Sequence, residues 1–436
     1  MKKRFAAVLS MLVLVVVMAL PVAATEGYEP DFDIYADAVY LVNTDTNIVV
    51  FDKNADAPLA SASLTKLMTS LLLLESYQDQ LDTITVTAPA YIYDILYGQN
   101  ASTADIRRGE TQSLRNLLYA MLLPSGNEAA YIVADYMGGG SLSNFISMMN
   151  DEAAKIGCTN TSFSDPCGLD PTNTMSARDA YLLLRALTGY DAFVQAAATA
   201  SYDMGTNERY TTAGTYIIQS TDKMLVQGTS YYRGYTRGGK TGSLEDWQNF
   251  AGWHTQDGVS YISVVMHSPE AIDPDGGRPA LVETGSLMDW AFKTYSVTTA
   301  LDTTQPITEI PIAYSTQTDT LMLYPTDEML TLLPKDGGSL TKQSFSLPAK
   351  ISAPIKQGDV VGTVTLSIND QELGTVELIA GSDVSRNQVM YTLAKIGEFF
   401  SSTYFKVVVI LAMIAVAVYT FLWVCALILR PGRRKK

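Results

Sequence analysis

The stretch SLTKLMTSLLLL, residues 63–74, places a serine and a lysine at the start of a long apolar run. Its apolar residues recur at helical spacing, which predicts a helix buried in the core of a domain. They are Leu67, Met68, Leu71, Leu72 and Leu74. Ser63 and Lys66 are three residues apart, so their side chains project from the same face of the first helical turn. The stretch therefore predicts a buried helix that presents a hydroxyl and an amine side by side.

The pair formed by Ser63 and Lys66 suits nucleophilic catalysis. A serine hydroxyl needs a base beside it, and a lysine serves as that base only if its pKa falls from about 10.4 toward neutrality. Burial and a second cation nearby both lower a lysine pKa. The Ser-x-x-Lys pattern also occurs at Ser220 and Ser339. Ser339 follows two glycines and precedes an alternating stretch, so we expect a turn there, whereas Ser63 opens a helix.

Two further motifs carry side chains of catalytic type. Ser125-Gly-Asn127 lies in a loop between two predicted helices, where helix capping by the serine and the asparagine is an equally good explanation. Lys240-Thr241-Gly242 precedes a predicted strand. Its lysine and threonine offer a charge and a hydroxyl to a carboxylate, and Gly242 would let a ligand backbone lie against the strand. A surface turn is the alternative for this triplet.

The periodicity of residues 30–298 predicts one α+β domain. Strands are expected at 38–42 and 48–51 and again within 239–268, so an antiparallel sheet would be built from distant segments. The intervening chain has helical spacing. Those helices are expected at 114–123, 128–136, 142–156 and 177–187, with a last one at 287–292.

A second, all-β domain is predicted over residues 304–385, where the sequence is rich in Thr and Pro and alternates. Its strands are expected at 307–312, 321–323, 351, 360–367 and 375–379. A linker at 386–405 is expected to follow it. Length agrees with this division, because 436 residues exceed what one core usually holds.

The two ends of the chain predict export and anchoring. Three cations, an apolar run and small residues up to Ala24 indicate a signal peptide at 1–24, with an uncleaved anchor helix as the alternative. Residues 406–429 predict a transmembrane helix, because they hold no charge after Lys406. The basic tail 430–436 places the C-terminus in the cytoplasm, so the catalytic domain would be extracytoplasmic and the protein a single-pass protein of the cell membrane.

Charge, cysteine and histidine content bear on which partners, disulfides and metals the protein can have. The formal net charge is −15, and many of the cations lie at the two ends, which argues against a nucleic-acid partner. Cys158 and Cys167 could form a disulfide or stay free. His254 and His267, the two histidines, lack ligands at suitable spacing, so we expect no metal and no cofactor.

The order of the three motifs is typical of serine β-lactamases and penicillin-binding proteins. The chain resembles most the D-alanyl-D-alanine carboxypeptidases among the low-molecular-mass penicillin-binding proteins, serine peptidase family S11. The resemblance runs from about residue 30 to 385 and extends well beyond the three motifs. The segments that carry it are 62–69, 121–130, 149–154, 175–179, 287–292 and 353–362.

This resemblance implies a β-lactamase/penicillin-binding-protein transpeptidase-like fold, then a β-sandwich-like domain and the transmembrane helix. It implies removal of the terminal D-alanine from peptidoglycan stem pentapeptides during cell-wall maturation. Ser63 would attack the carbonyl between the two D-alanines, and Lys66 would accept its proton. Ser125 would relay a proton to the leaving amine, while Asn127 would hold Lys66 and the substrate amide. β-Lactams would acylate Ser63.

The resemblance also implies a substrate-binding strand. Lys240 and Thr241 would bind the terminal carboxylate, and Gly242 would allow close approach. The backbone N–H groups of Ser63 and Ser243 would form the oxyanion hole.

Two departures from the family and two rival functions stay open. An added loop at 243–250 is expected to line the site, and 221–225 replaces a segment in which the family often carries Asn. A β-lactamase of class A needs a deacylating Glu, and residues 158–173 contain none. A penicillin sensor or wall scaffold would keep Ser63 but would accumulate acyl-enzyme.

Overall fold

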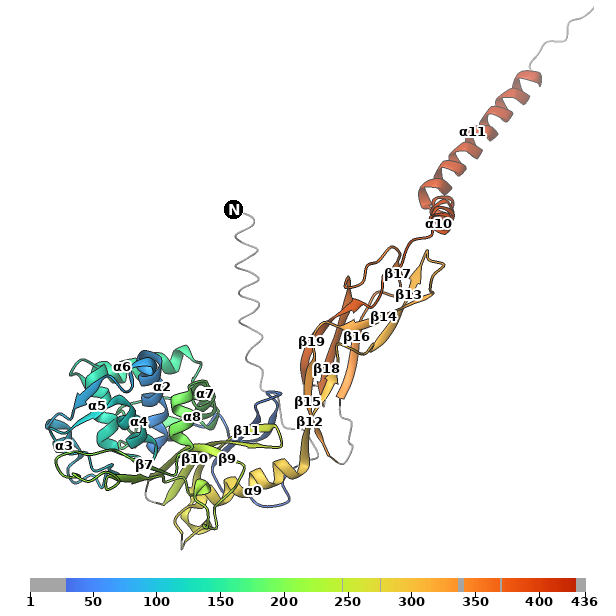
Figure 1. The fold of residues 1–436 in the computed structure, drawn as a ribbon. Helices are drawn as coiled ribbons and strands as arrows, with labels where there is room; N and C mark the ends of the chain where they lie inside the picture. Colours follow the sequence, from blue (N-terminus) through green and yellow to red (C-terminus); the bar gives the residue numbers. More distant parts are fainter. Residues whose placement is uncertain (1–28, 245, 275, 336–340, 369–370, 429–436) are drawn as a thin grey trace, which may run out of the picture. The chain divides into compact units, whose positions relative to one another are not determined.

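The computed structural model describes residues 29–244, 246–274, 276–335, 341–368 and 371–428 (Figure 1). The predicted signal peptide and basic tail lie outside the described residues. The chain divides into two compact units. The first holds residues up to 299 with the segments 330–342 and 367–373, and the second holds 300–329, 343–366 and 374–436.

A five-stranded antiparallel sheet forms the centre of the first unit, in the order β2-β1-β11-β10-β9. Its strands are β1 Ala38–Asn43, β2 Val49–Lys53, β9 Thr236–Leu244, β10 Trp247–Gln256 and β11 Val259–Pro269. Strand β1 pairs with β11 in a register that sets Ala38 opposite Met266. The prediction of an antiparallel sheet built from distant segments is therefore confirmed.

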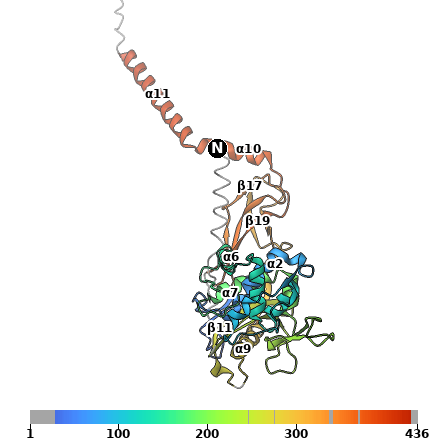
Figure 2. The ribbon, with the colours of Figure 1, turned by 90° about the vertical axis from the view of Figure 1, so that its left-hand side faces the viewer.

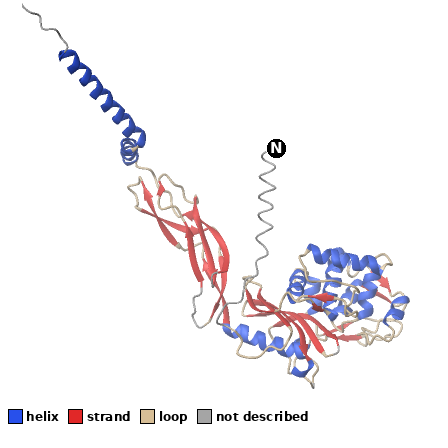
Figure 3. Ribbon diagram, turned by 180° about the vertical axis from the view of Figure 1, so that it is seen from behind, coloured by secondary structure: helices blue, strands red, loops and turns tan. Residues whose placement is uncertain are grey.

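Both faces of this sheet are covered. Alternate residues of β1 enter two different apolar clusters, because successive side chains of a strand point to opposite faces. Tyr40 and Val42 face the cluster that the larger set of helices builds, and Val39 and Leu41 face the cluster that includes α9. Figure 3 shows helices on both sides of the strands. The α+β class is confirmed, with the sheet as the middle layer.

The larger helical layer holds most of the predicted helices. Its helices are α2 Thr65–Tyr77, α3 Tyr91–Leu96, α4 Leu114–Leu122, α5 Asn127–Met137, α6 Leu142–Lys155, α7 Ala177–Leu187 and α8 Asp191–Ala197. On the other face, α9 spans Pro279–Thr294, longer than predicted. Short two-stranded sheets complete the unit. They pair β3 Leu59–Ala60 with β6 Thr174–Met175, β4 Thr85–Thr87 with β5 Thr111–Ser113, and β7 Ser201–Asp203 with β8 Ile217–Gln219.

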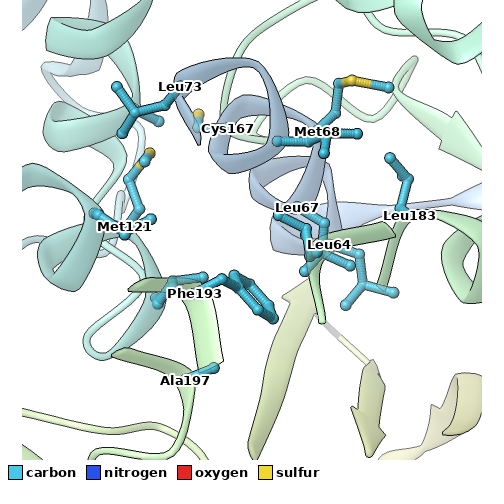
Figure 4. Close-up of a cluster of buried hydrophobic side chains, with 14 of the residues drawn as sticks. Leu64, Leu67, Met68, Leu73, Met121, Cys167, Leu183, Phe193 and Ala197 are labelled. Atoms are coloured by element: carbon cyan, nitrogen blue, oxygen red, sulfur yellow. The ribbon is translucent and has the colours of Figure 1, made fainter. Parts of the chain in front are cut away.

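Helix α2 is the centre of the helical layer. Its residues from Thr65 to Leu74 are all buried, as expected for a helix that is apolar on most of its faces. In Figure 4, Leu64, Leu67 and Met68 lie in an apolar cluster that also contains Met121 and Phe193. The apolar run that follows Ser63 therefore anchors this serine to a helix that is buried from Thr65 to Leu74.

The second unit contains a six-stranded sheet in the order β16-β18-β19-β14-β13-β17. Its strands are β13 Thr308–Ala313, β14 Thr320–Pro325, β16 Thr341–Ser346, β17 Ile351–Ser352, β18 Val360–Ile368 and β19 Gln371–Ala380. Strands β12 Tyr295–Leu301 and β15 Met329–Pro334 form a separate pair, most of whose residues belong to the first unit. The predicted all-β region is confirmed, although β12 and β15 were not predicted and β16 was expected only as an alternating stretch after Ser339.

Two helices follow the strands, as Figure 2 shows. Helix α10 spans Gln388–Ser401, so most of the expected linker is helical. Helix α11 spans Thr403–Ile428 and contains one candidate membrane span, Thr403–Leu427, by length and composition. Its apolar side chains are largely exposed, unlike those of a core helix.

Candidate active site

The nucleophile turn lies directly before α2. Ser63 is in a 3-10 turn, Ala62–Leu64, and the α-helix begins at Thr65. Lys66 Nζ donates to Ser63 Oγ at 2.8 Å, to Asn127 Oδ1 at 2.6 Å and to the carbonyl oxygen of Cys167 at 2.9 Å. The structure therefore confirms that the Ser63 hydroxyl and the Lys66 amine lie side by side.

The environment of Lys66 changes its acidity. The side chain is fully buried, and burial lowers its pKa because the charged form loses its hydration. The negative charges of Asp165 and Glu128 act in the opposite direction. Lys66 is thus an amine whose pKa has moved toward the range in which it can accept a proton.

The second motif forms a tight loop between α4 and α5. Ser125 has a φ of 62°, in the left-handed region, and Gly126 lies so close to Ala104 that a β-carbon would meet its backbone nitrogen at 3.1 Å. The N-cap of α5 is Gly126, with no side-chain cap. The capping explanation is therefore wrong, and Ser125 Oγ instead accepts from Lys240 Nζ at 2.9 Å.

The third motif lies inside strand β9, between the nucleophile turn and strand β10, and not in a surface turn. Lys240 is fully buried, and its Nζ also donates to the carbonyl oxygen of Thr241 at 2.7 Å. A β-carbon on Gly242 would lie 3.2 Å from Ser63 N, so the strand passes directly beside the nucleophile turn. Burial lowers the pKa of Lys240 well below its usual value, and the charge of Lys66 lowers it further.

The predicted loop at 243–250 is wrong in its conformation. Strand β9 extends to Leu244 and strand β10 begins at Trp247, so that Ser243 pairs with Gln248 and Leu244 with Trp247, while Glu245 lies outside the described residues. Ser243 Oγ accepts from Gln248 Nε2 at 3.2 Å. Trp247 stacks on His267 with ring centroids 3.7 Å apart. The added residues therefore lengthen a hairpin, because each of these four has a cross-strand partner.

Three residues that the sequence interpretation missed support this site. Glu128 Oε1 accepts from Thr103 Oγ1, Ala104 N and Ile106 N, which fixes the 103–106 segment beside the second motif. Asn249 Nδ2 donates to the carbonyl oxygens of Ala60 and Ser61, which fixes the nucleophile turn to β10. The signal for Glu128 was its place next to Asn127, directly before the apolar run of that helix.

The third missed residue is Thr221. Its Oγ1 lies 2.6 Å from Thr241 Oγ1, so it adds a second hydroxyl beside the third motif. Its N–H donates to the carbonyl oxygen of Leu123, two residues before Ser125. Thr221 thus joins the second and third motifs.

Among the described residues, the cysteines and the acidic side chains form neither a disulfide nor a metal-binding cluster. Cys158 and Cys167 are both free and buried, so the disulfide alternative is wrong. Within the described ranges, no group of three or more His, Cys, Asp and Glu side chains could hold a metal ion.

Comparisons with known proteins agree with this arrangement. A family model described as D-alanyl-D-alanine carboxypeptidase matches residues 23–270, and one described as Penicillin-binding protein 5, C-terminal domain, matches residues 295–386. The D-alanyl-D-alanine carboxypeptidase DacF of Bacillus subtilis is 25% identical over 80% of this chain and 86% of its own length. DacC of Escherichia coli, of the same description, is 27% identical over 80% of this chain and 84% of its own length.

Solved structures show the same fold. Penicillin binding protein 5 from Haemophilus influenzae superposes with a TM-score of 0.61 at 23% identity, over 82% of this chain and 100% of that chain. A point mutant of the Streptomyces K15 DD-transpeptidase gives a TM-score of 0.54 at 28% identity, over 60% of this chain and 99% of that chain.

Fold and site together define a serine enzyme of the penicillin-binding-protein class, in which three motifs from α2, the α4–α5 loop and β9 meet. The chain belongs to the D-alanyl-D-alanine carboxypeptidase family.

Proposed function

We propose that this protein removes the terminal D-alanine from peptidoglycan stem peptides that end in D-Ala-D-Ala, through an acyl-enzyme at Ser63. The observation that carries the proposal is the placement of two buried lysines, each of which donates to the hydroxyl of a different motif serine. Lys66 contacts Ser63 Oγ, and Lys240 contacts Ser125 Oγ. One amine is thus available for proton transfer and the other for binding an anion.

The acylation step uses the first two motifs. Ser63 Oγ attacks the carbonyl carbon of the penultimate D-alanine, and its proton passes to neutral Lys66. The C–N bond then breaks, and Ser125 relays the proton held by Lys66 to the leaving amine, which departs as free D-alanine and leaves Lys66 neutral and the Ser125 hydroxyl intact. Asn127 orients Lys66 through the 2.6 Å contact. Water then attacks the ester, which releases the shortened peptide and restores the Ser63 hydroxyl.

Substrate binding uses strand β9. Lys240 and Thr241 bind the terminal carboxylate, and Gly242 leaves room for the substrate backbone beside the strand. The N–H groups of Ser63 and Ser243 stabilise the oxyanion. The same geometry accepts a β-lactam, whose ring amide takes the place of the scissile bond and acylates Ser63.

Anchoring to the cell membrane is the second part of the proposal. Helix α11 is long and apolar enough to span a bilayer once. The exposed apolar residues of α10 recur at helical spacing and suit the lipid interface next to that span. They are Val389, Leu393, Ile396 and Phe400. In this proposal the first unit lies outside the cytoplasm, where peptidoglycan is.

The test is release of free D-alanine from diacetyl-Lys-D-Ala-D-Ala by the full-length chain in detergent, with Ser63→Ala as the matched control. We expect penicillin-sensitive release by the wild type, and loss of both release and fluorescent-penicillin labelling in the variant. Stable labelling without release would contradict the carboxypeptidase and favour a sensor. Rapid consumption of penicillin would favour a β-lactamase.

A further inference from the structure

A buried carboxyl group beside strand β9 has no role in the steps above. Asp222 lies in the segment that departs from the family pattern, and only 2% of its surface is exposed. Its Oδ1 accepts from Met224 N at 2.9 Å and caps the 3-10 helix Lys223–Leu225. Its Oδ2 is buried and has no hydrogen-bond partner among the described residues. One carboxylate oxygen would suffice for the cap. Burial of the second oxygen without a hydrogen bond costs desolvation free energy that the cap does not explain.

The surroundings of Asp222 connect it to the carboxylate-binding motif. Its neighbour Thr221 contacts Thr241 through their hydroxyl oxygens at 2.6 Å. The 3-10 helix that Asp222 caps packs against β9, the strand that carries Lys240. Both Asp222 and Lys240 are buried, so little water screens the attraction between their charges.

Lys240 needs such a countercharge. Its Nζ donates to two neutral oxygens, Ser125 Oγ and the carbonyl oxygen of Thr241, and the charge of Lys66 repels its protonated form. The negative charge of Asp222 favours that form. In the described part of the chain no direct ion pair joins the two side chains, so Asp222 acts at a distance.

We propose that Asp222 is a positioning residue for substrate recognition, which keeps Lys240 protonated and thereby able to bind the terminal carboxylate of the substrate. The proposal rests on the function assigned above to Lys240 and adds a regulation by pH to it. An uncharged capping residue at 222 would preserve the 3-10 helix and lose this effect.

The pH range of the effect follows from the groups that face each partner. Burial raises the pKa of Asp222 to about 7, and the charges of Lys223 and Lys240 lower it in part. Lys240 faces Lys66 from α2 and Asp222 from the 3-10 helix. Below pH 7 Asp222 is neutral, and its charge cannot help Lys240. Above pH 7 it is ionised and raises the pKa of Lys240, which delays the loss of the Lys240 proton as the pH rises.

The experiment compares KM and kcat for diacetyl-Lys-D-Ala-D-Ala between pH 5.5 and 9.5 in the full-length wild type and Asp222→Asn. Asn keeps the cap, because its side-chain oxygen also accepts from Met224 N. We expect equal KM values below pH 6, and above pH 7 a KM about three- to tenfold higher in the variant, with kcat changed less than about twofold. Asp222→Ser, a second uncharged capping residue, should give the same KM curve.

Two controls separate electrostatics from damage to the fold. Asp302→Asn makes the same change in an exposed turn of the second unit, where Asp302 Oδ1 accepts from Thr304 N, and should leave both constants unchanged. A substrate that ends in D-alaninamide lacks the carboxylate and should show no divergence between wild type and Asp222→Asn. A constant KM ratio at every pH, or no difference at all, would overturn the proposal. Absence of release by the wild type would instead overturn the proposed function.

Discussion

The surroundings of Lys66 and Lys240 differ in a way that matches their proposed tasks. Both amines are fully buried, but Lys66 has three acceptors and lies near the carboxylates of Asp165 and Glu128. Lys240 has two acceptors, one carboxylate, Asp222, that acts on it, and the positive charge of Lys66 nearby. Burial lowers the pKa of both lysines, and the positive charge of Lys66 also lowers that of Lys240. Lys240 therefore has less negative charge around it than Lys66 has, and a bound substrate carboxylate would supply more.

The largest effect is expected when the base, Lys66, is removed. Replacing Lys66 by Met keeps the volume and removes the group that accepts the Ser63 proton. We expect the acylation rate by fluorescent penicillin and the release of D-alanine to fall together, by about a hundred- to ten-thousandfold. Circular dichroism would verify folding. Acylation at the wild-type rate in a folded Lys66→Met protein would assign the base to another residue.

A smaller effect is expected from replacing Lys240 by Gln. Its contact with the substrate is a hydrogen bond to a charged group, so kcat/KM should fall about tenfold to a hundredfold, mainly through KM. The D-alaninamide substrate should lose much less, because it lacks the carboxylate. A loss confined to kcat, equal for both substrates, would mean that Lys240 serves proton transfer through Ser125 and that the two lysines do not differ as described.

The smallest effect is expected from a change at Glu128, which tests the electrostatic surroundings of Lys66. Replacing Glu128 by Gln keeps an oxygen for the 103–106 segment and removes a negative charge that holds up the pKa of Lys66. The pKa of Lys66 should then fall further, so neutral Lys66 persists to lower pH. The acid limb of kcat/KM should move to lower pH by a few tenths of a unit to about one unit.

The matched control for that variant is Glu152→Gln. Glu152 is also a buried acid on a helix, but it pairs with Lys155 on α6 and is not among the charges that act on Lys66. The pH dependence of kcat/KM in Glu152→Gln should coincide with that of the wild type. A shift of the acid limb to higher pH in Glu128→Gln would contradict the sign of the proposed interaction.

The three motifs could be predicted from the sequence, but not all of the side chains that hold them in place. Ser63 and Lys66 could be placed because both lie within one turn, where local spacing fixes their neighbourhood. The burial of Asp222 and the contacts of Asn249 depend on segments far apart in the chain, and no local pattern reports them. The same reason explains the 243–250 hairpin, since only cross-strand pairing distinguishes it from a loop.

Two strands of the β region escaped prediction for local reasons. Strand β12 starts at Tyr295, immediately after α9 ends at Thr294, so no turn residue marks the change from helix to strand. Strand β15 is an apolar run that ends in Pro334 and lacks clear alternation. Strands with polar turns on both sides, such as β13, were predicted within a residue or two.

The pairing of β1 with β11 has a consequence for biosynthesis. The strand at Ala38 is made first, yet its neighbour in the sheet is not available until the chain has grown past Met266. A topology dominated by such distant pairs folds slowly, because much chain entropy is lost before the contact forms. During that interval the apolar side chains on both faces of β1 lack their final partners. Newly made chains would therefore depend on protection from aggregation until the central sheet closes.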